Sequence, residues 1–202
     1  MVENSKSGSG EGPGWATPGP TRLKAAIAFH PLTADRWDDL VRLFGPRGAC
    51  GGCWCMVWRL PPKEWNAGKK DGGRGNRRRL KSLVTRGEAP GVLGYANGEP
   101  IAWCVVAPRA KYVALARSRV LAPLDDEPVW SISCLFVAKG HRRRGVGTRA
   151  IAAATELARS RGAKIVEAYP IVATMESTPD PAASSGRTFS GLGPKAPRSP
   201  RQ

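Results

Sequence analysis

The fold is decided by one stretch, Val129-Trp-Ser-Ile-Ser-Cys-Leu-Phe-Val-Ala-Lys-Gly-His-Arg-Arg-Arg-Gly-Val-Gly-Thr148. Its first nine residues, 129–137, are mainly apolar and rich in β-branched and aromatic types, which predicts a strand. Small apolar residues then recur at helical spacing, so we expect a helix over about 147–161. Between strand and helix lies a basic, glycine-rich loop, Arg142-x-x-Gly145-x-Gly147.

This loop has the chemistry of an anion-binding site. The first N–H groups of a helix have no intrahelical partners, and the helix dipole adds about half a positive charge there. The two glycines let the main chain approach an anion without a Cβ in the way. Three consecutive arginines add formal charge, and Thr148 offers a hydroxyl. A pyrophosphate would fit such a loop.

Other phosphate-binding loops have different spacings. A dinucleotide-binding loop requires G-x-G-x-x-G, and the loop of P-loop NTPases requires G-x-x-x-x-G-K-[ST]; neither pattern occurs at this junction. The remaining alternative is a basic turn that opens an ordinary helix.

Upstream of this stretch, a hairpin is the clearest element. Asn97-Gly98 separates apolar runs at 91–96 and 101–107, and both turn residues tolerate positive φ. A short apolar run, 25–29, predicts the first strand. Thr33 is a candidate N-cap for a helix that ends before Gly45-Pro46.

Three further segments complete the order of elements. A second helix is expected from Asn76 to Gly87, with its arginines and Lys81 facing outward, and a last strand over 163–169. The segment 47–75 is expected to be irregular, and 109–119 is expected to be a basic connector. The order therefore predicts an α/β fold with a mixed sheet flanked by helices, in which strand–helix–strand makes a right-handed parallel crossover.

In its strand, basic loop and helix, the chain resembles the GNAT superfamily of acetyl-coenzyme A-dependent N-acetyltransferases. The order of elements over residues 24–169 is also similar to that fold. Three segments resemble a bacterial GNAT subgroup whose substrate is undefined: Gly52-Cys-Trp-Cys-Met-Val-Trp-Arg59, Val129-Trp-Ser-Ile-Ser-Cys134 and Glu167-Ala-Tyr-Pro170.

The resemblance implies an acetyl-CoA site. In the family the central strand splays from the next strand at a bulge, and the thioester lies in the gap. The backbone of Leu135, Phe136 and Val137 would pair with the pantetheine arm. The pyrophosphate would contact the loop residues Arg142, Arg143, Arg144, Gly145, Val146, Gly147 and Thr148.

The implied reaction is acetylation of an amine on an unknown small molecule or protein. A base must first take a proton from the ammonium, and backbone N–H groups would stabilise the developing oxyanion. Glu167 and Asp126 are the candidate bases, and a water relay is an equal alternative. Tyr169 lies on the strand rather than on the helix that often carries the family's acid, so that role is not transferred to it.

The chain departs from the family after Tyr169, where a further helix and hairpin are expected and no such pattern is seen. The C-terminal part of the fold therefore looks missing or altered. This favours a second hypothesis, a catalytically degenerate acyl-CoA-binding module. A third, a basic nucleic-acid-associated protein, rests on charge alone and is disfavoured.

The aromatic and thiol residues admit two interpretations each. Trp54 and Trp58 are candidates for a substrate-pocket wall, with Trp130 on the central strand as a third, and plain core packing is the alternative. The spacing Cys50-x-x-Cys53-x-Cys55 suggests zinc, but a structural site needs four ligands and no second pair is recognisable. We expect no metal and interpret these thiols as core or pocket-lining groups.

Composition restricts the class of protein to which the chain can belong. The 202 residues carry a formal net charge of +16 and 41% hydrophobic residues, which is typical of one globular domain that favours anionic partners. We expect a disordered leader over 1–20, the GNAT domain over 24–171 and a disordered Pro/Ser/Gly-rich tail over 172–202. Five cysteines, with no signal or membrane segment, predict a cytoplasmic protein. A homodimer is left open.

Overall fold

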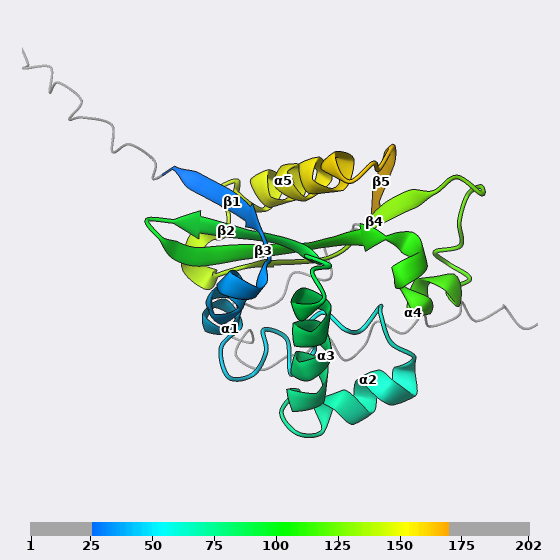
Figure 1. Ribbon diagram of the computed structural model, residues 1–202, viewed down its shortest axis with the longest axis horizontal. Helices are drawn as coiled ribbons and strands as arrows, with labels where there is room; N and C mark the ends of the chain where they lie inside the picture. The colour runs from blue at the N-terminus through cyan, green and yellow to red at the C-terminus, as the bar shows by residue number, and fades with distance from the viewer. Residues whose placement is uncertain (1–25, 170–202) are drawn as a thin grey trace, which may run out of the picture.

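The computed structural model describes residues 26–169. They form one five-stranded sheet in the order β1-β2-β3-β4-β5, in which β1 to β4 pair antiparallel and β5 runs parallel to β4. The helix α5 covers one face of the sheet, and α1, α2 and α3 lie on the other (Figure 1). The strands are β1 (Ile27–Pro31), β2 (Gly91–Ala96), β3 (Glu99–Pro108), β4 (Val129–Val137) and β5 (Ile165–Ala168).

Five α-helices and three short 3-10 helices connect the strands within the described residues. The α-helices are α1 (Trp37–Phe44), α2 (Pro62–Lys69), α3 (Arg74–Thr85), α4 (Val113–Ala116) and α5 (Val146–Ser160). The 3-10 helices are η1 (Ala34–Arg36), η2 (Arg109–Lys111) and η3 (Lys139–His141).

The predicted mixed sheet flanked by helices is confirmed. β4 has the predicted bounds, and the hairpin turns through Asn97 and Gly98, both of which have positive φ. The predicted parallel pairing of the strands on either side of α5 is also observed. These elements were predictable because each depends on local spacing or on a turn that only a few residue types permit.

Two helices lie outside the helices that the sequence predicted. α2 follows Pro61, in the segment predicted to be irregular, and lacks a clear apolar stripe; α4 follows η2 and has only four residues, too few for a periodic pattern. α2 is fixed by tertiary contacts instead: the buried Asn76 side chain of α3 donates to the carbonyl oxygens of Gly52 and Trp65, at 2.9 and 3.3 Å. The prediction of irregular structure over 47–75 was therefore wrong for α2, and the basic connector 109–119 contains the short α4.

The sheet has a different core on each face. The α5 face is packed with small residues, so the helix lies close to the strands; Ala150, Ala154 and Ala158 are fully buried. The opposite face holds a large aromatic core that includes Trp37, Phe44, Trp54, Trp103 and Tyr112. Leu80 and Val84 anchor α3 in that core, which confirms α3 as an amphipathic helix with an outward basic face.

Several predictions concern residues outside the described range. The leader over 1–20, the tail over 172–202 and the departure from the family after Tyr169 all fall there, and the domain limits 24 and 171 stay predictions. Over residues 26–169, none of the helices combines the length and the apolarity that a membrane span requires.

Candidate functional site

The two C-terminal strands pair over only part of their length. β4 and β5 are in register from Val129 opposite Ile165 to Ile132 opposite Ala168. β4 continues for five more residues, 133–137, for which β5 supplies no partner. Within the described residues, this edge of β4 therefore has backbone groups that no strand pairs.

A β-bulge lies where the pairing ends. Cys134 is opposite Val105 of β3, but Ile132 is opposite Val106, so Ser133 is an extra residue on β4. Such a bulge bends the strand and leaves backbone groups out of the ladder. Close to it, the hydroxyls of Ser133 and Tyr112 are buried without a hydrogen-bond partner among the described residues. The bulge thus coincides with the end of the β4–β5 pairing, and the splay of the two strands that the resemblance implies stays a prediction.

The basic loop after β4 turns its main chain toward the start of α5. Arg143 and Gly145 have positive φ, 58° and 74°, and residues in such alternating conformations can direct successive N–H groups into one concavity. Nε of Arg142 donates to the carbonyl oxygen of Val137 at 2.9 Å, which ties the loop to the end of β4. The predicted loop between strand and helix is observed.

The first turn of α5 has free amides. Gly145 is the N-cap and has no side-chain cap, and the first N–H to reach back to it is that of Arg149, at 3.2 Å. The N–H groups of Val146, Gly147 and Thr148 precede that bond and so have no intrahelical acceptor. No acidic residue lies in this turn. The helix end is thus electrostatically open to an anion.

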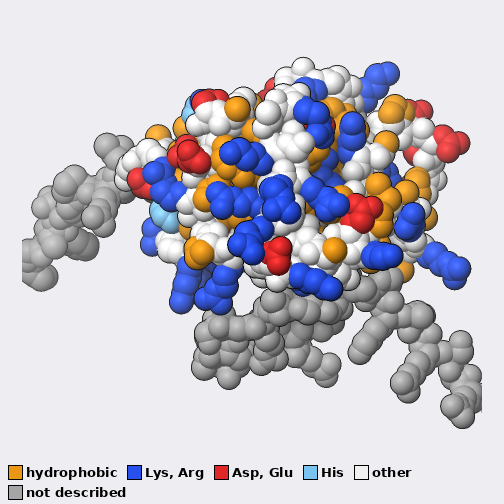
Figure 2. All heavy atoms as spheres, turned by 60° about the horizontal axis from the view of Figure 1, so that its bottom comes forward, with side chains coloured by type: hydrophobic (Ala, Val, Ile, Leu, Met, Phe, Trp, Pro, Cys, Tyr) orange, Lys and Arg blue, Asp and Glu red, His pale blue; other side chains and the backbone are white. Residues whose placement is uncertain are grey.

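The arginines of the loop keep their charge available. Arg143 and Arg144 are exposed, and within residues 26–169 neither forms an ion pair. Elsewhere on the molecule, Lys and Arg side chains are spread over the face in Figure 2, which includes the side that carries α2 and α3. The loop differs from that general basicity because its arginines directly precede a helix start with free backbone N–H groups.

The loop also adjoins an apolar strand edge. Leu135 is 42% exposed, a large fraction for a leucine on a central strand. A Cβ placed on Gly147 would lie 3.4 Å from Cδ2 of Leu135, so β4 and the helix start are neighbours. The free amides of the helix start, predicted to bind a diphosphate, therefore adjoin a partly apolar edge of β4 that no described strand pairs. These residues fit acetyl-CoA, whose diphosphate and amide-containing arm need those two surfaces in that order.

Glu167 lies in a polar cluster on the paired segment of β4 and β5, opposite Ser131. Its Oε1 accepts hydrogen bonds from Nη1 of Arg109 and Oγ of Ser131, both at 2.6 Å, and from Oη of Tyr169 at 2.5 Å. Partial burial alone would raise the pKa of Glu167, but the hydrogen bonds from Ser131, Tyr169 and Arg109 outweigh it and lower the pKa. Burial and the Glu167 carboxylate raise the pKa of the Tyr169 hydroxyl.

Asp126 lies apart from this cluster. It is exposed in the turn before β4, and no hydrogen bond or ion pair joins it to Glu167, Arg109 or Tyr169. Of the two carboxylates proposed from the sequence, only Glu167 lies on the paired segment of β4 and β5. The sequence analysis missed Arg109 and Ser131, because nothing in their local spacing indicates that they meet Glu167.

The three tryptophans proposed for a substrate wall do not form one surface. Trp54 is 2% exposed and stacks on Trp37 with ring centroids 6.0 Å apart, so its burial favours the alternative of core packing. Trp58 is half-buried at the margin of the same core. Trp130 packs with the α5 face instead and lines a separate cavity. A role of each in substrate binding stays a prediction.

Two of the cysteines form a thiol pair that joins the core to β4. Sγ of Cys55 lies 3.5 Å from Sγ of Cys134, and Nε1 of Trp103 donates to Cys55 at 3.3 Å. The hydrogen bond to Cys134, together with burial, raises the pKa of Cys55, and the same bond lowers the pKa of Cys134. Cys134 thus lies on the expected strand, in contact with the core.

Comparisons with known proteins identify the family of this chain. The model of the Acetyltransferase (GNAT) family matches residues 54–177, more than half of the chain. A search of curated proteins found no match. Among solved structures, the aminoglycoside 6'-N-acetyltransferase AAC(6')-Ih from Acinetobacter baumannii is 16% identical, with 86% of this chain and 100% of that chain covered and a TM-score of 0.46.

Two other solved structures are similar at the same level. A GCN5-related N-acetyltransferase from Ralstonia eutropha JMP134 is 17% identical, with 85% and 99% of the two chains covered and a TM-score of 0.44. The aminoglycoside N-acetyltransferase AAC(6')-Iy, solved with CoA, is 17% identical, with 76% and 82% covered and a TM-score of 0.44. With the family model matched over most of the sheet, over the basic loop and over α5, the chain belongs to the GNAT acetyltransferase family.

Proposed function

We propose that this protein transfers an acetyl group from acetyl-CoA to a primary amine of a small molecule or a protein. One observation carries the proposal: the unpaired edge of β4 leads from the bulge at Ser133 to the free amides at the start of α5. Family membership supports the transferase class. The acceptor is assigned only as an amine.

The cofactor would be held by two surfaces. The backbone of Leu135, Phe136 and Val137 would hydrogen-bond the pantetheine arm. The residues 142–148 would hold the pyrophosphate through backbone N–H groups, guanidiniums and the Thr148 hydroxyl. Acetyl-CoA supplies an acetyl thioester, which a neutral amine displaces with release of the thiol. Unpaired N–H groups at the bulge would stabilise negative charge on a carbonyl oxygen placed there.

Glu167 is the stronger candidate for handling the amine's proton. All three hydrogen bonds to its side chain end on Oε1, so Oε2 has no partner among the described residues and can accept from an ammonium group. In model peptides an alkylammonium and a Glu carboxyl differ by about six pKa units, which makes direct proton transfer unfavourable. We therefore assign Glu167 to orienting the ammonium through a hydrogen bond to Oε2. The ammonium proton is lost to hydroxide or a buffer base in the solvent, directly or through a water relay, before the neutral amine attacks the thioester. Asp126 remains the second candidate.

Calorimetry with acetyl-CoA is the first test. The wild-type protein should bind one equivalent, and Gly147→Glu should weaken binding by about 100-fold, because a carboxylate would then oppose the diphosphate at the helix start. Ala152→Glu adds the same charge on an exposed position of α5, beyond the first turn, and should bind within about twofold of wild type. No heat of binding with the wild type would end the proposal.

Turnover on a panel of primary amines is the second test. Free thiol should form together with the acetylated amine, and Glu167→Gln should lower kcat/KM by about 100-fold while leaving the affinity for acetyl-CoA unchanged. Binding without turnover on any amine would support the degenerate acyl-CoA-binding module. Equal activity of the wild type and Glu167→Gln would remove Glu167 from the mechanism.

A further inference from the structure

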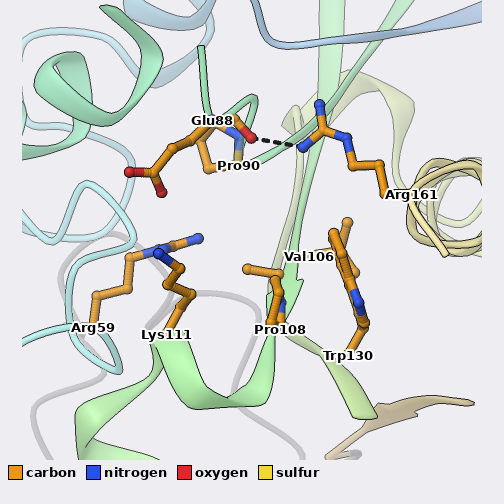
Figure 3. Close-up of a pocket in the computed structure, with 9 residues that line it drawn as sticks. Arg59, Glu88, Pro90, Val106, Pro108, Lys111, Trp130 and Arg161 are labelled. Atoms are coloured by element: carbon orange, nitrogen blue, oxygen red, sulfur yellow. Dashed lines mark hydrogen bonds between the residues drawn. The ribbon is translucent and has the colours of Figure 1, made fainter. Parts of the chain in front are cut away.

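A cavity lies at the end of the sheet opposite to the basic loop. It is bounded where β2 begins, β3 ends and β4 begins, by Pro90, Pro108 and Trp130, and has a volume of about 190 Å³. The loop that follows β4 is at the other end of that strand, so the cavity and the proposed diphosphate seat are separate. Figure 3 shows that the cavity collects side chains from segments far apart in the sequence.

Arg59 is the unusual residue of this cavity. Only 9% of it is exposed, and its Nε is buried with no hydrogen-bond partner among the described residues. Within residues 26–169 no carboxylate lies within ion-pair distance of it. Its guanidinium carbon lies 5.0 Å from the centre of the Tyr112 ring. The ring attracts the charge but offers no acceptor in the plane of the N–H groups.

Burial of the Arg59 Nε without an acceptor is unfavourable unless a partner compensates for its lost hydration. The cavity's own carboxylate does not do so: Glu88 pairs with Arg86 at 3.1 Å. Arg161 is also engaged, because its Nη1 donates to the carbonyl oxygens of Glu88 and Ala89 at 2.7 and 3.2 Å. Lys111 adds a second cation beside Arg59, again without an ion pair in the described part of the chain.

The rest of the lining is apolar. Val106 and the half-buried Trp130 lie across the cavity from Arg59 and Lys111, and Pro90 and Pro108 complete the apolar lining (Figure 3). The cavity therefore has a cationic side and a hydrophobic side. A ligand that satisfies both has one anionic group and a small apolar body.

We propose that this cavity binds a small organic carboxylate, whose carboxylate pairs with Arg59 and whose apolar part contacts Trp130. A carboxylate suits Arg59 because its two oxygens can accept parallel N–H groups from one guanidinium. A phosphate dianion suits the cavity less well, because it brings more negative charge close to the Glu88 carboxylate at the margin and has no apolar part to contact Pro90, Val106 and Pro108. This site is additional to acetyl-CoA binding and does not depend on it.

Benzoate and inorganic phosphate are the probes, used with the full chain. Calorimetry and thermal unfolding are run in the Gly147→Glu background, so that the basic loop cannot bind the probes. Benzoate should bind with a 1:1 stoichiometry and raise Tm, and more weakly bound phosphate should raise it less. Arg59→Met should weaken benzoate binding at least tenfold. Lys63→Met, an exposed charge on α2 outside the cavity, should bind as the parent does.

A second variant keeps the test decisive if Arg59→Met does not fold. Lys111 is exposed, so Lys111→Met should fold normally and still weaken benzoate binding several-fold through the lost charge. The proposal is overturned if benzoate does not bind, if it binds Arg59→Met and Lys111→Met as tightly as the parent, or if phosphate binds more tightly than benzoate.

Discussion

Two segments of this chain contain the same tripeptide, Arg-Arg-Arg, at 77–79 and at 142–144, and the structure uses them differently. The first lies inside α3, where backbone N–H groups are already bonded within the helix. Its Arg77 lies over the Trp54 ring at 5.4 Å, and its Arg79 pairs with Glu64 of α2 at 3.1 Å. The second precedes free N–H groups at the start of α5.

The difference shows that the main chain decides what a basic run does. In α3 the backbone N–H groups are already bonded within the helix, so only the arginine side chains are available for interactions. They contact Trp54 and Glu64 within the protein. In the loop, Arg143 and Gly145 have positive φ, so N–H groups and guanidiniums can act on the same anion. Charge counted from the sequence is equal in the two segments, yet only the second has the backbone of an anion site.

Removing the ring beneath the α3 triplet should have the largest effect. Trp54→Ala deletes a buried side chain that contacts Trp37, Phe44 and Arg77, and should lower the free energy of unfolding by about 3–5 kcal/mol. Urea unfolding followed by circular dichroism measures this loss. The affinity of the folded protein for acetyl-CoA should stay within about twofold of wild type.

Two comparisons make this result interpretable. Trp54→Phe keeps an aromatic ring and should lose less stability, which provides a folded variant if Trp54→Ala does not fold. Trp58→Ala removes a half-buried ring and should also lose less. If Trp54→Phe instead left the free energy of unfolding unchanged and raised the KM for the acceptor, Trp54 would be part of the substrate pocket. The α3 region would then have a role in substrate binding as well as in stability.

The elements that the sequence predicted correctly are those with local causes. The strand 129–137, the Asn97-Gly98 turn and the alanine face of α5 each follow from the spacing of neighbouring residues. The bulge at Ser133 was expected only through the family resemblance. Nothing in the residues themselves places it, because a bulge depends on the register with β3.

The parts that were not predicted depend on contacts between distant residues. Arg109 meets Glu167 across 58 positions of sequence, through η2 after β3 and through the short pairing of β4 with β5. α2 lacks an apolar stripe and is held by Asn76 of α3. Arg59 belongs to an irregular segment, so its burial beside a cavity has no local signal either.

An intermediate effect is expected when charge is removed from the basic loop. The double variant Arg143→Gln, Arg144→Gln should weaken acetyl-CoA binding by about tenfold, which corresponds to about 1.4 kcal/mol. Its affinity should also depend less on salt, since exposed charges are screened. The free energy of unfolding should change by less than about 0.5 kcal/mol, because neither side chain packs in the core.

The matched control removes the same two charges from the other triplet. Arg78→Gln, Arg79→Gln leaves the protein with the same net charge as the loop variant, but should leave the affinity for acetyl-CoA within about twofold of wild type. If both double variants weaken binding equally, the overall positive field of the protein, and not the loop, attracts the anion. The distinction between the two triplets would then fail for binding.

The smallest effect concerns the ion pair of α3 itself. Arg79 and Glu64 are 42% and 50% exposed, so their coupling in a double-mutant cycle of Arg79→Gln and Glu64→Gln should be about 0.5 kcal/mol or less. Glu64 also lies in the first turn of α2, where its negative charge interacts favourably with the helix dipole. The single variant Glu64→Gln should therefore lose more stability than the ion pair with Arg79 contributes. The cycle cancels that contribution, and a second cycle of Glu64→Gln with the neighbouring Arg78→Gln should give a coupling near zero. A coupling above about 1.5 kcal/mol would mean that the α3 triplet stabilises the fold through its charges as much as through Trp54, and the two triplets would then differ in location more than in chemistry.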